Sequence, residues 1–322
     1  MIPLIDADIL RYEVGATGQY IDEETGEPVA KDFGGVADNF DQKVKEICAE
    51  VWGTEEPILF LSMDARTKRR DAKRIDKKVK RLEKRLEANP LDGMAQKEIV
   101  QLEEEKVYKP NFREEVAKKK AYKVGRKASV KPLHYDNLTE YILARYECVM
   151  AEGLEADDLL SIHQREAAPL TTIICSRDKD LKMVPGLHFS WACGKQKQFG
   201  PECVDEMGRL FPIYRGVTTK GERKLAELKG TGMCFFAAQL LTGDSVDSIP
   251  GLPGCGPKKA FEVLSVCDEV DDLFIAVKEL YVKKFGDTWD VELLEQGQLL
   301  WMVAELDDKG EPVMWQIPEV ML

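Results

Sequence analysis

The sequence predicts an α/β protein with a central, mostly parallel sheet, an inserted charged helical hairpin and a helical C-terminal region. Three short runs are apolar along their whole length, which is typical of buried parallel strands: residues 2–5 (IPLI), 57–63 (PILFLSM) and 171–175 (TTIIC). Helical patterns lie between them, at about 36–52, 136–151 and 155–167. This alternation of strands and helices indicates an open sheet covered by helices.

Length and composition exclude several classes of protein. A chain of 322 residues can form one large or two modest domains, each with a buried core. It contains no apolar run of 18 residues and no leader-like segment, so we expect a cytoplasmic protein that is neither membrane-bound nor secreted. The eight cysteines form no CxxC pair, and there are only three histidines. Disulfides, zinc sites and a histidine-based triad are therefore not expected.

The charge of the chain is distributed unevenly. The net charge is −12, but residues 64–135 hold 23 Lys and Arg against 12 Asp and Glu. The other 250 residues hold 23 basic and 46 acidic side chains. An acidic body with one basic segment indicates a localised contact with a polyanion.

Much of the positive charge lies in a predicted helical hairpin at about residues 66–107. Apolar residues follow a 4-3-4 spacing on its first helix, which is otherwise rich in Lys and Arg: Ile75, Val79, Leu82 and Leu86. Residues 89–93 (NPLDG) break this helix, and a Glu-rich helix follows through about Tyr108. The hairpin either steers a nucleic-acid strand or is simply a solvated charged element, and the sequence leaves both interpretations open.

A glycine-rich segment at residues 241–260 (LTGDSVDSIPGLPGCGPKKA) combines two kinds of site. Asp244 and Asp247, spaced i, i+3, are better placed to hold a metal ion than to contact DNA. Glycines leave backbone amides uncovered, so a phosphate backbone can approach closely at Gly251, Gly254 and Gly256. A proline then suits the first turn of a helix that begins with two phosphate-facing cations, Lys258 and Lys259. An ordinary surface turn does not need this whole pattern.

Carboxylates gather at the predicted strand ends and at one helix start. Nine of them are candidate metal ligands: Asp6, Asp64, Glu155, Asp157, Asp158, Asp178, Asp180, Asp244 and Asp247. At one edge of a parallel sheet they would crowd negative charge into a single cleft, which like-charge repulsion forbids without cations. Hard carboxylate oxygens select Mg²⁺ or Mn²⁺, and two such ions about 3.5–4 Å apart support phosphodiester hydrolysis. Asp8 is an alternative or a support to Asp6.

Six segments, in this order, resemble the motifs of the structure-specific 5′ nucleases, which include flap endonucleases, the 5′-nuclease domain of bacterial DNA polymerase I and bacteriophage 5′→3′ exonucleases. They are IDADIL (5–10), FLSMDA (60–65), NFREEVAKKKAYKVGRK (111–127), LEADDLL (154–160), SRDKDLKMVPG (176–186) and LTGDSVDSIPGLPGCGPKKA (241–260). The segment EQGQLLWM (295–302) is most similar to the tailed-phage exonucleases.

This resemblance implies a PIN-like fold and a division of the chain. An α/β nuclease core is expected at residues 1–200, with the inserted hairpin at 66–110 and a basic, arch-like segment at 111–135. A helical region is expected at 201–322, with a helix–three-turn–helix motif at about 241–265 that binds duplex DNA.

The resemblance also assigns roles to individual residues. One metal site would use Asp6, Asp64, Glu155, Asp157 and Asp158, and a second would use Asp178, Asp180, Asp244 and Asp247. In the family, the tyrosine of a Tyr-Lys pair stacks on the nucleotide at the scissile position and the lysine neutralises the scissile phosphate, which points to Tyr122 and Lys123. Further phosphate-binding cations would be Arg113 and Arg126. Without the resemblance, Tyr122 reads as a half-buried aromatic residue and Lys123 as a solvated cation.

The implied cofactors are two Mg²⁺ ions, for which Mn²⁺ can substitute, and a K⁺ ion at the hairpin of residues 251–256. The implied partners are double-stranded DNA with a 5′ end or flap, RNA/DNA hybrids and replication proteins, in the host cytoplasm if the chain is phage-encoded. One departure from the family is Ser176-Arg177 before the Asp-Lys-Asp motif, which predicts an extra cation beside the second metal site.

We therefore expect a metal-dependent 5′→3′ DNA exonuclease that also removes RNA primers and flaps. One alternative is a flap-specific endonuclease with little exonuclease action. An alternative of another class is a non-catalytic DNA-binding replication scaffold, which would have no reason to keep nine mutually repelling acids.

Overall fold

The computed structural model describes residues 1–62, 65–88, 92–105, 111–123, 130–217, 221 and 223–322, with the backbone alone for 65–74 and 103–105. The strands are β1 (Ile2–Asp6), β2 (Gln19–Ile21), β3 (Pro28–Ala30), β4 (Ile58–Ser62), β5 (Glu147–Ala151), β6 (Thr172–Cys175), β7 (Gly186–Ser190), β8 (Phe199–Val204), β9 (Leu210–Val217) and β10 (Arg223–Gly230). The helices are α1 (Ala7–Thr17), α2 (Phe33–Glu50), α3 (Ala65–Ala88), α4 (Gly93–Glu105), α5 (Phe112–Val116), α6 (Tyr135–Arg145), α7 (Ala156–Glu166), α8 (Gly232–Thr242), α9 (Pro257–Leu264), α10 (Val270–Phe285) and α11 (Trp289–Leu300). Single 3₁₀ turns are η1 (Asp180–Met183), η2 (Gly286–Thr288) and η3 (Glu319–Met321).

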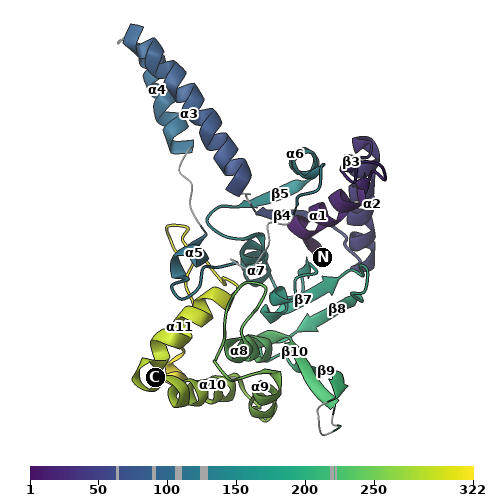
Figure 1. The fold of residues 1–322 in the computed structure, drawn as a ribbon, viewed down its shortest axis with the longest axis vertical. Coiled ribbons are helices and arrows are strands. Elements are labelled where there is room, and N and C mark those ends of the chain that lie inside the picture. The colour runs from purple at the N-terminus through teal and green to yellow at the C-terminus, as the bar shows by residue number, and fades with distance from the viewer. Residues whose placement is uncertain (63–64, 89–91, 106–110, 124–129, 218–220, 222) are drawn as a thin grey trace.

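A six-stranded sheet in the order β5-β4-β1-β6-β7-β8 forms the centre of the molecule (Figure 1). Strands β5, β4, β1, β6 and β7 run parallel to one another, and β8 is antiparallel to β7. In register, Ile5 of β1 lies opposite Leu59 of β4 and Cys175 of β6. The strand order reverses at β1, and open α/β sheets place their sites at the carboxyl ends of the strands around such a point.

The apolar strands are buried on both faces, which explains why their sequences do not alternate with polar residues. Successive side chains of a strand point to opposite faces: Leu4 packs in one hydrophobic cluster and Ile5 in another, and Phe60 and Leu61 divide in the same way. One face is covered by α1, α2 and α6, and the other by α7, which contacts β1, β4, β5 and β6. The predicted strands and the predicted sheet type are therefore confirmed.

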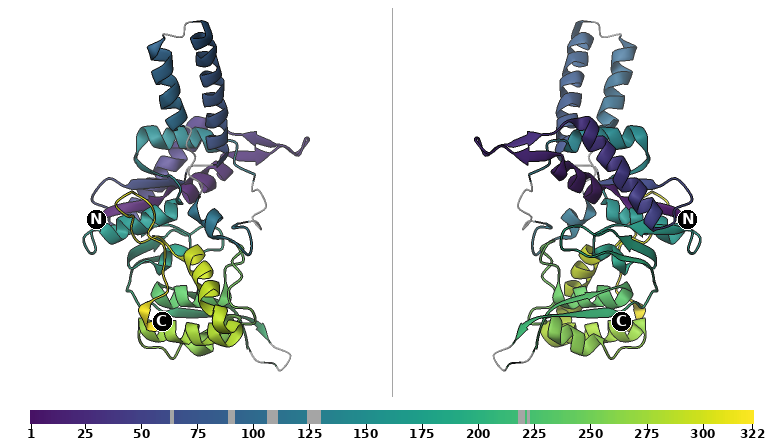
Figure 2. Two further views of the ribbon diagram at one scale, coloured as in Figure 1. Left: turned by 90° about the vertical axis from the view of Figure 1, so that its left-hand side faces the viewer. Right: turned by 90° about the vertical axis from the view of Figure 1, so that its right-hand side faces the viewer.

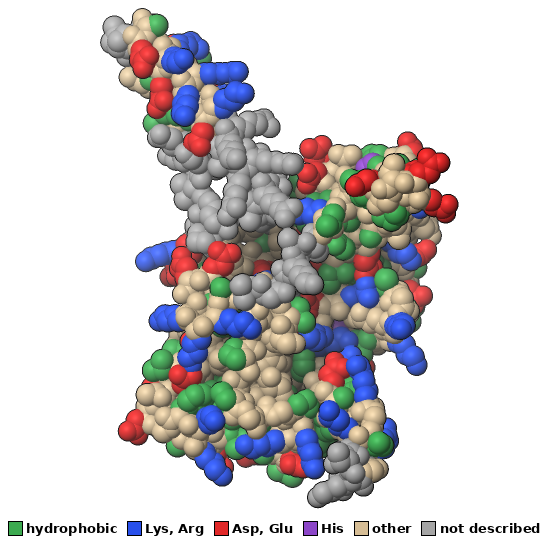
Figure 3. Space-filling view, viewed as in Figure 1, with side chains coloured by type: hydrophobic (Ala, Val, Ile, Leu, Met, Phe, Trp, Pro, Cys, Tyr) green, Lys and Arg blue, Asp and Glu red, His purple; other side chains and the backbone are tan. Residues whose placement is uncertain are grey.

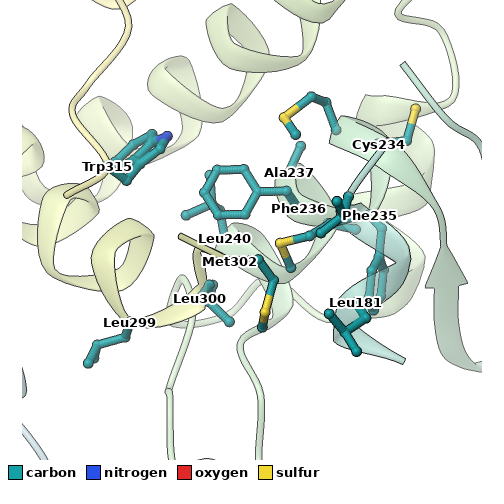
Figure 4. Packing of buried hydrophobic residues seen from close by; sticks show 14 of the residues in the cluster. Leu181, Cys234, Phe235, Phe236, Ala237, Leu240, Leu299, Leu300, Met302 and Trp315 are labelled. Atoms are coloured by element: carbon teal, nitrogen blue, oxygen red, sulfur yellow. The ribbon is translucent and has the colours of Figure 1, made fainter. Parts of the chain in front are cut away.

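The C-terminal helices pack around α8. Every residue of α8 from Gly232 to Leu241 is buried, and the Phe236 ring lies 5.1 Å from the Trp301 ring and 5.6 Å from the Trp315 ring (Figure 4). Helices α9, α10 and α11 all contact α8. The same hydrophobic cluster continues into α7 and the sheet, so these helices are joined to the parallel sheet through a shared core.

Helices α3 and α4 pack side by side and project from the sheet (Figures 1 and 2). Their contact is a small apolar cluster that contains Val79, Leu82 and Leu102, with Ile75 and Leu86 at its border. Ion pairs connect the two helices, with Lys78 Nζ 2.9 Å from Glu98 Oε1. None of the described helices combines the length and the apolar character that a bilayer span requires.

One expectation from the sequence is wrong, and another missed an element. Residues 147–151, which we expected to continue a helix, form β5, because Cys148, Val149 and Met150 pair with β4 and pack on both faces of the sheet. The region from residue 201, which we expected to be mainly helical, is helical from α8 onwards but begins with the end of β8 and with an antiparallel ribbon of β9 and β10. This ribbon is largely exposed and has two register shifts, so buried and exposed side chains alternate only at the end of β10.

A buried ion pair joins α5, α7 and the chain after α11. Arg113 donates to both carboxylate oxygens of Asp158, at 2.7 and 2.8 Å, and to the carbonyl oxygens of Leu299 and Trp301. Both side chains are almost fully buried, at 1% and 0% exposed. The backbone amides of Glu155 and Val303 also donate to Asp158. We expected Arg113 to bind DNA and Asp158 to hold a metal ion. Neither role fits these positions, because the polar atoms of both side chains are already hydrogen-bonded to each other and to the backbone.

We expect the removal of either partner alone to destabilise the protein strongly. Arg113→Met or Asp158→Leu leaves an uncompensated buried charge and should lower the free energy of unfolding by about 3–5 kcal/mol. The double variant should lose clearly less free energy of unfolding than the two single variants lose together, because neither charge of the pair is left without its partner. Urea unfolding of the three variants measures this coupling. Additive costs would contradict the assigned pairing.

Candidate active site

A cavity of about 330 Å³ opens at the carboxyl ends of the parallel strands. Apolar side chains of Ile249, Leu299, Leu300 and Met302 form part of its wall. Eight carboxylates also line it: Asp6, Asp8, Glu155, Asp157, Asp178, Asp180, Asp244 and Asp247. The other lining residues are Ile9, Ser62, Arg113, Tyr122 and Lys123. Seven of the nine predicted metal ligands therefore meet in one cavity although they are spread over most of the chain.

Two of these carboxylates come from the end of β1. Asp6 caps α1 by accepting a hydrogen bond from the amide of Ile9 at 3.1 Å, and it accepts another from Ser176 Oγ at 2.7 Å. One oxygen of Asp8 pairs with the buried Arg11 at 2.6 Å, and the other accepts from the amide of Ser62 at 3.0 Å. Asp8 is therefore paired with a cation of its own helix, although burial still raises its pKa, whereas Asp6 has no cation beside it among the described residues.

The start of α7 supplies Glu155 and Asp157. Lys123 Nζ is hydrogen-bonded to one oxygen of Glu155, and the Tyr122 hydroxyl donates to the other at 3.1 Å and to Asp247 at 3.2 Å. Lys123 has a φ of 55°, in the left-handed region that side chains rarely adopt, and its amide donates to the carbonyl of Asp247. Such strained backbone is concentrated at functional sites.

The loop after β6 and the segment after α8 complete the cavity. The amide of Asp180 donates to Asp178 at 2.8 Å, which folds the two carboxylates into one turn. Lys179 Nζ lies 2.9 Å from Asp180 and 2.5 Å from Asp244, and Gln239 of α8 donates to Asp180 at 2.6 Å. Lys179 and Gln239 were not predicted. The DKD motif is a signal that could have indicated the lysine, whereas nothing in the sequence marks the glutamine.

The carboxylates of the cavity divide electrostatically into two groups. Burial would raise the pKa of Glu155 and of Asp244, but Lys123 beside the first and Lys179 beside the second lower the pKa overall. Burial and the repulsion of Asp178, Asp6 and Glu155 raise the pKa of Asp157 well above its usual value. Burial, followed by repulsion from a neighbouring aspartate, raises the pKa of Asp6 and that of Asp180 to about 7.

Three carboxylates with raised pKa values, Asp6, Asp157 and Asp180, show whether the cavity suits a metal ion. Asp157 has no hydrogen-bond or ion-pair partner among the described residues, and the negative charges of Asp178 and Asp6 repel its own charge. No three carboxylates of the described chain converge as a finished ligand set, and the two lysine ammonium groups lie between several of them. The donor set is nevertheless all oxygen and carries excess negative charge, which fits hard divalent cations.

Other predicted residues lie elsewhere. Asp64 and Arg126 fall outside the described residues. Arg177 does not add a cation to the site, because it pairs with Glu13 of α1 and donates to Gln196. Tyr122 and Lys123 do line the cavity.

The glycine-rich segment divides into a buried and an exposed part. Gly251 is buried and donates its amide to Gln296 Oε1 at 3.0 Å, and a Cβ there would lie 2.2 Å from the amide nitrogen of Gly243. The DNA contact predicted for Gly251 is therefore wrong, since its amide is used inside the protein. Gly254 and Gly256 are exposed with open space around them, and Gly256 caps α9, whose first turn carries the exposed Lys258 and Lys259.

The chain is similar in sequence to bacterial and phage nucleases. It is 33% identical to DNA polymerase I of Rhizobium leguminosarum over 44% of this chain and 12% of the polymerase. It is 30% identical to a 5′-3′ exonuclease of Mycoplasma pneumoniae over 38% of each chain, and 24% identical to the exonuclease of Escherichia phage T7 over 55% of this chain and 60% of that protein. The predicted resemblance to 5′ nucleases is confirmed.

The chain spans only part of the length of these 5′-nuclease relatives. No family model matches it. Among solved structures, the T5 D15 protein co-crystallised with metal ions aligns with a TM-score of 0.47 and 11% identity, over 94% of this chain and 89% of that one.

We expect the metal-free protein to lose stability as the pH rises. The carboxyls of Asp6 and Asp180 have folded-state pKa values of about 7 against an ordinary value of 3.8. The stabilisation that comes with their protonation is therefore complete below about pH 4 and is lost as the pH rises through about 7. Urea unfolding in EDTA between pH 4 and pH 8 measures this change.

The variant Asp6→Asn/Asp180→Asn should show a smaller fall than the unsubstituted protein over the same range. Subtracting the two profiles removes contributions that both proteins share, such as His188, whose pKa burial lowers to about 4. Asp38→Asn, an exposed change on α2, is the control. If the double variant and the unsubstituted protein change in parallel, the pKa values of Asp6 and Asp180 are not raised in the folded protein.

Proposed function

We propose that this chain is a metal-dependent 5′→3′ DNA exonuclease that hydrolyses phosphodiester bonds at 5′ ends of duplex DNA. The observation that carries the proposal is the convergence of eight carboxylates in one cavity beside Tyr122 and Lys123. The sequence similarity to proteins named 5′-3′ exonuclease and exodeoxyribonuclease supports the same activity. RNA primers and 5′ flaps are further substrates in this proposal, and replication proteins are its proposed partners.

The carboxylates of the cavity would hold two Mg²⁺ ions, with Mn²⁺ as a substitute. Asp6, Glu155 and Asp157 would serve one ion, and Asp178, Asp180, Asp244 and Asp247 the other. Bound divalent ions supply an activated water and stabilise the leaving oxygen. Asp158 is not included in this set, because Arg113 occupies both of its oxygens.

Tyr122 and Lys123 would bind the DNA end. Burial raises the pKa of the Tyr122 hydroxyl, so it remains a hydrogen-bond donor that holds Glu155 and Asp247 in place. Lys123 Nζ lies at the cavity wall next to Glu155, where it is close enough to the acids to exchange a carboxylate partner for a phosphate oxygen. Both side chains line the cavity, and the backbone of Lys123 is left-handed there.

The duplex would lie against the first turn of α9. The amides at this helix start have no side-chain cap, and Gly256 leaves space for a phosphate to approach them. The Lys258 side chain is 74% exposed, and its Nζ lies 3.8 Å from Glu262 Oε1 in a loose surface ion pair. The proposed K⁺ ion at the hairpin of residues 251–256 rests on the family resemblance alone.

The test is Mg²⁺-dependent release of label from a duplex labelled at one 5′ end. An exonuclease releases labelled mononucleotides, a flap endonuclease releases a flap-length oligomer only from a flapped substrate, and a scaffold releases nothing. Asp180→Asn should lower turnover by several orders of magnitude, because a metal ligand is lost. DNA binding should be kept or become tighter, because a negative charge near phosphate is removed.

Asp38→Asn, which removes one exposed charge on α2, is the matched control and should cleave normally. Cleavage by Asp180→Asn at the unsubstituted rate would mean that the assignment of the cavity as the metal site is wrong.

A second prediction concerns the α9 contact. Lys258→Ala/Lys259→Ala should weaken binding of duplexes of any sequence, and the dependence of log Kd on log salt should become shallower by about one to two. Binding is measured in EDTA by fluorescence anisotropy over a range of salt concentrations. An unchanged salt dependence would place the duplex elsewhere on the protein.

A further inference from the structure

The ribbon of β9 and β10 is an element that neither the sequence analysis nor the proposed function uses. Its two strands pair antiparallel, with Phe211 opposite Lys229 and Ile213 opposite Glu227. Figures 1 and 2 show β9 and β10 at the end of the molecule that holds α8 and α9. A strand of eight residues, the length of β9, spans about 27 Å.

The ribbon is strongly basic in a chain whose net charge is −12. Between residues 209 and 230, the described positions include one acid, Glu227, and five exposed cations: Arg209, Arg215, Arg223, Lys224 and Lys229. Glu227 lies 3.0 Å from Arg215 and 3.7 Å from Lys229. Arg223 lies over the Tyr214 ring at 4.8 Å. Among the described residues, no carboxylate pairs with Arg223 or Lys224.

One face of the ribbon is fixed to the protein and the other faces solvent. Leu228 and Gly230 are buried, and β10 packs against both α8 and α9. Glu227 and Lys229 alternate with them and so point outwards. The contact with α9 places the ribbon cations on the same end of the molecule as Lys258 and Lys259. Figure 3 shows Lys and Arg side chains gathered along this lower end.

We propose that the β9–β10 ribbon is a second duplex-binding surface, which extends the contact of α9 along the DNA. Three observations support a polyanion as its occupant: the excess of cations, their exposure, and the contact with the proposed duplex-binding helix. Over about 27 Å a DNA duplex presents about 16 phosphates, so a ribbon of this length can follow the backbone beyond α9. The proposal rests on the proposed function, because it takes duplex DNA as the substrate.

The experiment compares two double variants on two lengths of DNA. Arg223→Gln/Lys224→Gln removes the two ribbon cations that pair with no carboxylate in the described part of the chain. Lys43→Gln/Lys45→Gln removes two exposed cations from α2, which packs on the other face of the sheet. Binding to duplexes of about 10 and about 30 base pairs is measured in EDTA at several salt concentrations. Thermal unfolding of each variant checks that the fold is intact.

The ribbon variant should bind the long duplex about tenfold more weakly at low salt. The slope of log Kd against log salt concentration should become shallower by about one to two. Its affinity for the short duplex and its kcat on saturating DNA should match those of the α2 variant. Equal affinity of the two variants for the long duplex overturns the ribbon proposal while leaving the proposed function intact. Binding to single-stranded DNA is measured in the same way. A larger loss of affinity for single-stranded DNA than for duplex in the ribbon variant overturns the ribbon proposal as well. Failure of the unsubstituted protein to bind either duplex overturns both the ribbon proposal and the proposed function.

Discussion

The mutual repulsion of buried carboxylates is the constraint on which the rest of the structure depends. Eight of them share one cavity, and the described structure balances only part of their charge, through Lys123, Lys179 and Arg11. Burial, and after it repulsion from neighbouring carboxylates, raises the pKa values of Asp6, Asp157 and Asp180. A folded protein tolerates such an arrangement at neutral pH when cations are supplied from outside, and the proposal that the cavity holds metal ions rests on this argument.

The fold meets this constraint by placing some carboxylates in the cavity and pairing another with a cation in the core. Asp157 and Asp158 are neighbours in sequence, but α7 turns the first towards the cavity and the second towards the core, where Arg113 neutralises it. That pair connects α7 to the chain after α11, so the C-terminal helices are held against the sheet at the level of the site. The same arrangement brings Asp244 from the end of α8 next to Lys179 from the loop after β6.

The sequence predicted the parallel strands and most of the cavity, because both depend on local patterns. Apolar runs identified β1, β4 and β6, and the aspartates at their ends could be assigned to one edge of the sheet. It could not distinguish Asp157 from Asp158, or assign Arg113 to the core, because those outcomes depend on which side chains meet across α5 and α7. The ribbon of β9 and β10 was missed for a different reason: both its strands are largely exposed, so hydrophobic periodicity is weak.

The most direct measurement of the central claim is anomalous diffraction from crystals of the protein soaked in Mn²⁺. The account predicts two strong anomalous peaks inside the cavity, one near Asp6 and Asp157 and one near Asp178 and Asp180. Crystals of Asp157→Asn grown and soaked in the same way should lose or weaken the first peak. An empty cavity in the unsubstituted protein, with Mn²⁺ bound only elsewhere, would contradict the account.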